Sequence, residues 1–246
     1  MTDSKPILFY DIASAAPVRP YAPNPCKTRY ALNFKGVHYR TEWVELPEVE
    51  STRKKLGCDP VRFFPNGTPF YTLPVVKDTS TGELVGDTFD IAVYLDKAYP
   101  DGPRLFPPST IGLHKAFNAQ VDAIFSAHAR LFSDGLPFNP DTAEQTRDHF
   151  VRRVGASCWD DLTYRGEARV KALEEFKAAL GELAKFYIHK DGPFLEGETP
   201  FYADFIVGGW LRMMKEVLKE SEELFTWHDG IWKRIHLALE KYAEVK

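Results

Sequence analysis

The side chains best placed for chemistry lie where a loop meets an expected helix, in the segment VRPYAPNPCKTRYALNFKG, residues 18–36. Asn24 is a favoured N-cap residue, Pro25 suits the first helical position, and Gly36 suits the left-handed residue that ends a helix. The spacing therefore predicts a helix that Asn24 caps and Gly36 terminates. Because a helix N-terminus favours negative charge, this end is a candidate site for an anion.

Two further features suit a small ligand with an α-amino acid group. Leu73-Pro74 heads an expected strand, where proline cannot continue a central ladder, and a cis bond there would expose the backbone of Leu73. Asp87-Thr88 begins another expected helix, whose N–H groups and hydroxyl suit a carboxylate, while Asp87 suits an ammonium group. Asn24 and Asp87-Thr88 could each be plain capping residues, but their occurrence together with Leu73-Pro74 favours a binding site.

Cys26 stands in the first turn of the same helix, where its pKa could fall and permit mixed-disulfide chemistry. No cysteine follows at CxxC spacing, so the alternative that Cys26 faces the core stays open. The cysteines form neither a disulfide framework nor a metal knuckle and the histidines are scattered, so the sequence predicts no metal site. The basic run Arg53, Lys54 and Lys55 is expected on a solvated helix face.

The first hundred residues alternate between strand and helix patterns. Expected strands cover 6–12, 39–46, 70–78 and 83–87, and expected helices cover 24–36 and 87–100. Residues 47–57 are expected to form a short, mostly solvated helix or an ordered loop. This mixed α/β unit, residues 1–100, precedes a proline-rich linker over 101–110. In 111–246 the apolar residues recur with a helical period, which predicts an all-α domain.

Composition argues against several classes of partner. The 246 residues carry a net charge of −4, so no positive field attracts nucleic acid or an anionic membrane. The apolar stretch over 201–211 is too short to span a bilayer and contains Asp204. The start, MTDSKPILFYD, lacks the pattern of a secretory signal, and a reducing cytoplasmic location is expected.

The run NPCKTRYALNFKG followed by YRTEWVELPEV resembles the glutathione transferase superfamily, and within it the fungal etherase-like FuA class. The resemblance covers nearly the whole chain. It implies a thioredoxin-like N-terminal domain that binds glutathione as co-substrate and an all-α C-terminal domain that adds a pocket for a hydrophobic substrate. It also implies that Leu73-Pro74 pairs with the peptide backbone of glutathione and that Asp87-Thr88 holds its γ-glutamyl head.

Two further assignments depend on this resemblance. The basic run at Arg53 is a weaker candidate for the glycyl carboxylate of glutathione. The late segment TPFYADF resembles the capping motif of the family's buried helix, with Asp204 as its aspartate. Phe201 stands where that motif has serine or threonine, and Thr199 is a candidate substitute.

The activating group for a bound thiol is not the one that related sequences carry. Where they often have serine, this chain has Ala22. Lowering a thiol pKa by about two units requires roughly 2.7 kcal/mol of preference for the thiolate, whereas a helix N-terminus supplies about 0.3 to 1 kcal/mol. A hydrogen bond to a charged group adds roughly 1.5 to 3 kcal/mol. Asn24 is therefore the first candidate donor, through its amide NH₂, followed by Tyr21 and then Ser14.

The sequence predicts a glutathione transferase that acts on and binds hydrophobic aromatic or phenolic compounds in detoxification, with ether-cleaving or peroxidase activity as possible side reactions. The resemblance implies a homodimer. Ala22 supports an alternative, a weakly catalytic binding protein for aromatic molecules. A third alternative is a thiol-transferase or reductase that depends on Cys26.

Overall fold

The computed structural model describes residues 6–64, 67–189 and 191–246. The N-terminal part builds a mixed sheet from β1 (Ile7–Ile12), β2 (Tyr39–Val44), β5 (Val75–Asp78) and β6 (Leu84–Gly86), in the order β2-β1-β5-β6. β1 and β2 are parallel, and the other neighbouring pairs are antiparallel. A separate short hairpin pairs β3 (Arg62–Phe63) with β4 (Pro69–Phe70). The expected hairpin over 70–87 is found as the β5–β6 pair, but its first strand begins only at Val75, because Phe70 pairs with β3 instead.

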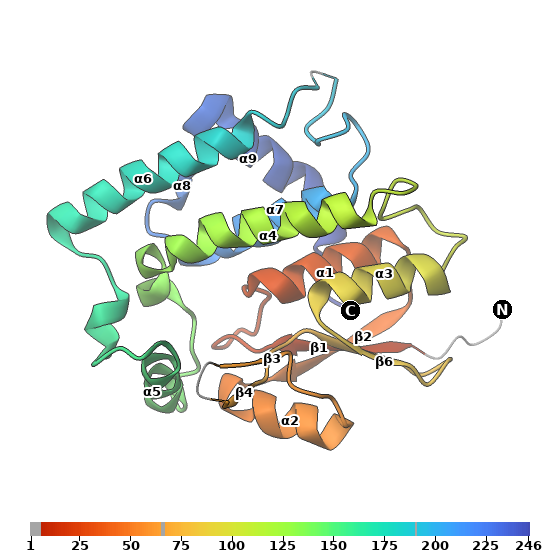
Figure 1. The fold of residues 1–246 in the computed structure, drawn as a ribbon, viewed down its shortest axis with the longest axis horizontal. Coiled ribbons are helices and arrows are strands. Elements are labelled where there is room, and N and C mark those ends of the chain that lie inside the picture. Colours follow the sequence, from red (N-terminus) through yellow and green to blue (C-terminus); the bar gives the residue numbers. More distant parts are fainter. Residues whose placement is uncertain (1–5, 65–66, 190) are drawn as a thin grey trace.

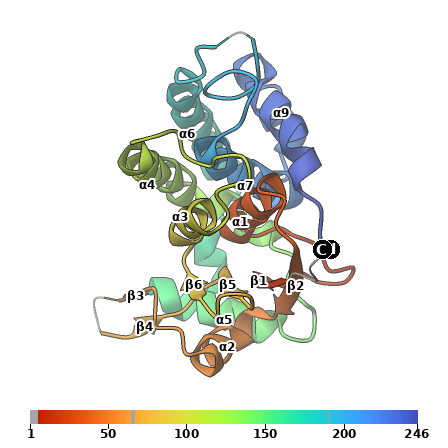
Figure 2. The same cartoon turned by 90° about the vertical axis from the view of Figure 1, so that its right-hand side faces the viewer.

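Helices cover both faces of this sheet. α1 (Pro23–Phe34) and α3 (Thr88–Ala98) lie on the face toward the helical domain, and α2 (Val49–Leu56) lies on the other (Figures 1 and 2). The parallel β1–α1–β2 unit requires such a crossover helix, because parallel strands cannot be joined by a tight turn. A short 3₁₀ turn, Leu46–Glu48, follows β2, so the expected strand over 39–46 ends two residues early.

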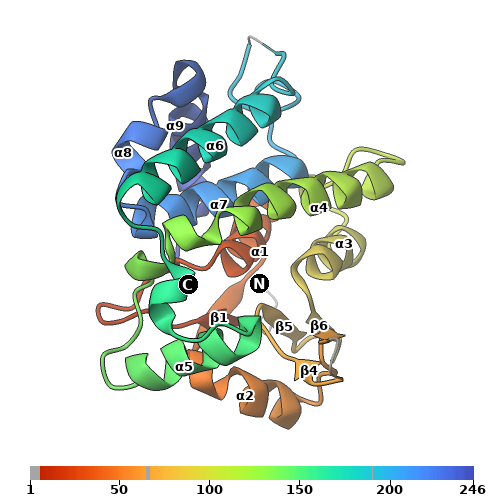
Figure 3. The same cartoon turned by 60° about the vertical axis from the view of Figure 1, so that its left-hand side comes forward.

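The rest of the chain is helical, as predicted. It contains α4 (Ile111–Ala127), α5 (Ala143–Val154), α6 (Gly166–Ala184), α7 (Tyr202–Val217), α8 (Ser221–Leu224) and α9 (Trp227–Leu239), with short 3₁₀ turns between and after them. Figure 3 shows α5 beside α2, apart from the bundle formed by α4, α6, α7 and α9. No helix in the described part of the chain is long and apolar enough to cross a membrane.

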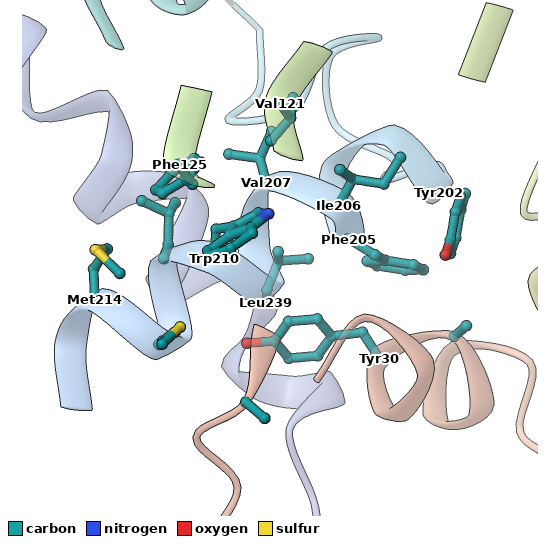
Figure 4. Close-up of a cluster of buried hydrophobic side chains, with 14 of the residues drawn as sticks. Tyr30, Val121, Phe125, Tyr202, Phe205, Ile206, Val207, Trp210, Met214 and Leu239 are labelled. Atoms are coloured by element: carbon teal, nitrogen blue, oxygen red, sulfur yellow. The ribbon is translucent and has the colours of Figure 1, made fainter. Parts of the chain in front are cut away.

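The two parts share one hydrophobic core, in which α7 is the central helix. α1 packs on α7 more extensively than on any other helix. Tyr30 of α1 lies against Phe205 of α7, with ring centroids 6.0 Å apart, and Figure 4 shows the surrounding α7 side chains. A Cβ at Gly209 would lie 2.5 Å from the carbonyl oxygen of Pro23, so this glycine permits α7 to approach the first turn of α1. The core therefore fixes the position of the helix end that carries Asn24.

Candidate functional site

Three backbone elements converge at one edge of the sheet. In the strand register Val75 pairs with Tyr10 of β1 and with Gly86 of β6. The residues just before Val75 therefore lie beside the end of β1 on one side and beside Asp87 on the other. Since the chain leads from β1 to α1 and from β6 to α3, the starts of both helices and Leu73-Pro74 share this edge.

The first turn of α1 differs from the prediction by two residues. The N-cap is Ala22, which offers no side-chain hydrogen bond, and the helix begins at Pro23. The prediction that Asn24 caps the helix is therefore wrong: Pro23 already has the φ that the first helical position needs, and its missing N–H has no partner there in any case. Gly36 is confirmed as the left-handed stop, with φ +68°.

This shift leaves the helix end poor in backbone donors. Pro23 and Pro25 have no N–H group, and the Cys26 N–H donates to the Ala22 carbonyl at 3.1 Å. Within the first turn, the Asn24 N–H is therefore the one free donor. The Asn24 side chain is half-buried and makes no hydrogen bond to any described residue, so its amide remains free for a ligand.

The other candidate donors differ in their availability. Tyr21 is buried, and burial, with Asp11 and Glu45 nearby, raises the pKa of its phenol well above the ordinary value, so it remains a neutral donor. Ser14 is already engaged: its hydroxyl donates to the Ala15 carbonyl and accepts from the Arg19 N–H, both at 2.9 Å. Tyr21 thus stays a candidate, and Ser14 serves the loop.

Cys26 is a residue of the core. Its side chain is 2% exposed, and burial, reinforced by the nearby Asp11 carboxylate, raises the pKa of its thiol to about 12. The prediction that its pKa falls is therefore wrong, because the helix carries this side chain inward, away from the solvated end. The alternative that Cys26 faces the core is the one that the structure supports.

The Leu73-Pro74 peptide bond is cis, as expected. The Leu73 side chain is buried, which leaves its backbone as the part that can meet a ligand. Within the described residues, the Leu73 carbonyl accepts only a long 3.4 Å contact from the neighbouring Thr72 hydroxyl. The backbone of Leu73 is thus available for pairing with an extended peptide.

Arg53 supports this edge from behind. Its guanidinium donates to the Thr72 carbonyl at 2.8 Å and to the Asp59 carbonyl at 2.7 Å. A Cβ on Gly86 would lie 2.8 Å from the same guanidinium, so Arg53 also fills the space beside β6. The expectation of a solvated Arg53 is therefore wrong, since α2 turns this side chain inward and only Lys54 and Lys55 are exposed. With its two terminal nitrogens on backbone carbonyls, Arg53 is a positioning residue.

Asp87 and Thr88 begin α3 as predicted. Asp87 is the N-cap and accepts from the Phe89 N–H at 3.1 Å, in a left-handed conformation with φ 101°. The Thr88 carbonyl accepts from the buried Tyr202 hydroxyl at 3.0 Å, which ties this end of α3 to α7. A cavity of 370 Å³ adjoins Asp87 and is also lined by Asp90 and Arg53. Two carboxylates at its wall suit an ammonium group.

A buried polar cluster that the sequence interpretation missed holds the first turn of α1 to the helical domain. Lys27 is fully buried, and its Nζ donates to Asp122 Oδ1 at 2.6 Å. The Trp210 indole donates to the same oxygen at 2.6 Å, and Asn118 donates to the other at 2.9 Å. The sequence does carry one clue to this cluster, because Lys27 lies on the same helical face as the apolar residue Tyr30, one turn further along the helix.

Asp204 lies in the first turn of α7. Its carboxylate accepts from the Phe201 N–H and the Leu195 N–H, both at 2.9 Å, and burial raises its pKa to about 7. Thr199 is exposed and makes no hydrogen bond to a described residue, so it does not replace the missing hydroxyl. Phe201 occupies the N-cap position without a side-chain cap. In the described residues no three His, Cys, Asp or Glu side chains gather as a metal site would require.

Comparisons with known proteins agree with this architecture. The model of the glutathione S-transferase N-terminal domain matches residues 21–98, and that of the C-terminal domain matches residues 113–242. The chain belongs to the glutathione S-transferase family, with a thioredoxin-like N-terminal domain and a helical C-terminal domain.

Three of the similar proteins come from fungi. The glutathione S-transferase-like protein ustS of Aspergillus flavus is 30% identical over 224 residues, which cover 84% of this chain and 79% of ustS. The glutathione S-transferase CsGST63524 of Ceriporiopsis subvermispora, solved in complex with glutathione, is 37% identical with a TM-score of 0.90 over 98% of this chain and 99% of that one. GSTFuA2 from Phanerochaete chrysosporium is 30% identical with a TM-score of 0.83 over 99% and 100%. The resemblance to the FuA class is confirmed.

Proposed function

We propose that this protein binds glutathione across the shared sheet edge and transfers it to hydrophobic aromatic or phenolic electrophiles. The observation that carries the proposal is the convergence of three elements at that edge: the start of α1 with Asn24, the Leu73 backbone and the start of α3 at Asp87-Thr88. The structures of two similar Ceriporiopsis subvermispora transferases, described as complexes with glutathione, support the choice of ligand.

The placement of glutathione follows from the chemistry of each group. The ammonium of the γ-glutamyl head faces Asp87, and its carboxylate faces the N–H groups at the start of α3. The cysteinyl backbone pairs with Leu73, and the sulfur lies at the first turn of α1. There the Asn24 NH₂ donates to the thiolate, with the Tyr21 hydroxyl as a second donor.

The reaction follows from a stabilised thiolate. The sulfur lone pair attacks the electrophilic carbon, a carbon–sulfur bond forms, and the leaving group departs with the bonding electrons. The residues of this chain bind the thiolate, orient it toward the substrate and stabilise it in its deprotonated form. Aromatic side chains suit stacking against an aromatic substrate.

A calorimetric titration with glutathione, followed by turnover of a chromogenic aryl halide, tests the proposal. Binding that disappears on Asp87→Ala, together with turnover that depends on glutathione, is the expected result. Absence of both heat and a thermal upshift with millimolar glutathione would overturn it.

Size measurement by light scattering tests the homodimer that we also propose, and localisation of a tagged chain tests the cytoplasmic assignment.

One specific observation favours a second candidate, a binding protein for aromatic molecules with little catalysis. Ala22 supplies no hydroxyl, and two prolines leave a single free N–H in the first turn of α1. Tight binding of hydroxylated aromatics with negligible turnover of several electrophiles would favour this function. The reductase alternative is disfavoured because Cys26 is buried, and activity on a disulfide substrate that vanishes in Cys26→Ser would restore it.

A further inference from the structure

A second cavity, of 630 Å³, lies between the β3–β4 hairpin, the start of α2 and the end of α5. Its walls carry the aromatic rings Phe64, Phe70 and Tyr71, and the basic residues His149, Arg152 and Arg153. Phe70 lies three residues before Leu73, so the Leu73 backbone lies within about 11 Å of the Phe70 backbone. Figure 1 shows α5 beyond the N-terminal end of α1, on the side away from α3.

Two guanidinium groups lie over the Phe70 ring. The guanidinium carbon of Arg153 lies 4.0 Å from the ring centroid, and that of Arg62 lies 4.7 Å from it. Arg62 is placed there by the β3–β4 register, which pairs it with Phe70. Arg153 comes from the last turn of α5, so two segments distant in sequence bring these charges to one ring.

Neither arginine has an acidic partner. Among the described residues no carboxylate forms an ion pair with Arg62 or Arg153, and Glu50, which lines the cavity, pairs with Lys54 at 2.7 Å. Burial, with Arg62 as a like charge nearby, lowers the pKa of Arg153 to about 10. A basic residue at the C-terminal end of a helix is stabilised by the helix dipole, and one guanidinium on a ring is a common contact. Two unpaired guanidinium groups at one ring repel each other, so neither the helix dipole nor a single guanidinium–ring contact explains why both lie there.

We propose that Arg62 and Arg153, with Phe70, form a subsite for the carboxylate of a bound ligand. A carboxylate in the cavity accepts from Arg153, which lines it, and offsets the repulsion between Arg153 and the neighbouring Arg62, while the aromatic wall accommodates a ring attached to it. This inference rests on the proposed function, in which two ligands can carry the group. One is an aromatic acid as second substrate, and the other is glutathione itself, at its glycyl end.

The test compares Arg153→Met and Arg62→Met with Arg147→Met, which removes an exposed charge from the same helix outside the cavity. The electrophiles are chloronitrobenzoate and its methyl ester, and the thiols are glutathione and γ-glutamylcysteine, which lacks the glycine. If the subsite takes an aromatic acid, KM for the acid rises roughly tenfold or more and KM for the ester stays constant. If it takes the glycyl carboxylate, KM for glutathione rises by that factor with either electrophile, and KM for γ-glutamylcysteine does not.

The proposal would be overturned if both variants keep all KM values within twofold of wild type. An equal effect of Arg147→Met would overturn it as well. Arg153→Lys, which keeps the charge, is expected to retain most of the binding. That retention would show that the loss in Arg153→Met comes from the missing charge and not from a folding defect. Turnover of the methyl ester by the wild-type protein tests the proposed function separately. If that turnover is absent, calorimetric titration of chloronitrobenzoate and S-methylglutathione into wild type and Arg153→Met still decides whether the subsite exists.

Discussion

Replacing Asn24 by alanine tests the source of thiolate stabilisation. Its amide makes no hydrogen bond within the described residues and lies at a helix end with one free backbone donor. A hydrogen bond to a charged group stabilises it by roughly 1.5 to 3 kcal/mol, which corresponds to about one to two pKa units. We therefore expect Asn24→Ala to raise the pKa of the glutathione thiol by that amount.

The kinetic consequence depends on pH. If the bound thiol has a pKa about two units below the free value of about 8.5, roughly three quarters of it is ionised at pH 7. A rise of one to two units reduces the thiolate fraction at pH 7 by about 3- to 25-fold, with a matching fall in kcat/KM. The loss should disappear above the raised pKa, since the thiol is then ionised without help.

The assay is a titration of the thiolate ultraviolet absorbance, paired with a pH profile of aryl halide turnover. Melting temperature is the control, and it should change little because the Asn24 side chain caps nothing. Adding Ala22→Ser to the variant should recover part of the shift by supplying a hydroxyl near the same sulfur. Superimposable titrations of wild type and Asn24→Ala would refute this role for Asn24.

Four further outcomes are expected. Asp87→Asn should weaken glutathione binding roughly tenfold, measured by calorimetry, because an ammonium group loses a charged acceptor. Arg53→Met should lower the melting temperature and weaken glutathione binding together, because the Thr72 and Asp59 carbonyls lose their buried donor. Cys26→Ser should leave the pH profile of turnover unchanged, and a shifted profile would count against its burial in the core. Although burial opposes it, hydrogen bonds from Ser80, Tyr99 and Tyr94 lower the pKa of Asp78 to about 2, so its stabilisation is present above about pH 4 and is lost as pH falls toward 2; Asp78→Asn should cost about 2 kcal/mol at pH 7 in denaturant titrations and flatten this acid dependence.

The sequence predicted the fold well because its signals are local. Proline at the head of β5, glycine after α1 and aspartate before α3 each act through backbone conformation within a few residues. The error at Asn24 is also local: Pro23 and Pro25 both suit the first helical position, and the helix begins at the earlier of the two.

Interactions between distant segments could not be predicted from the sequence alone. The burial of Arg53 depends on carbonyl groups from two loops, and the Lys27 cluster joins α1 to α4 and α7. The Arg62–Arg153 pair requires the docking of α5 against a hairpin far away in the sequence. No periodicity or spacing in a single sequence encodes such meetings, because they arise from how the elements pack.

The twin prolines that open α1 have a consequence for how such a protein can diversify. They leave this helix end almost bare of main-chain donors, so under the proposed function the electrostatics around the sulfur depend on a few replaceable side chains. Exchanging one of them alters reactivity while the scaffold beneath stays intact. A short mutational path therefore connects a conjugating catalyst with an inert carrier.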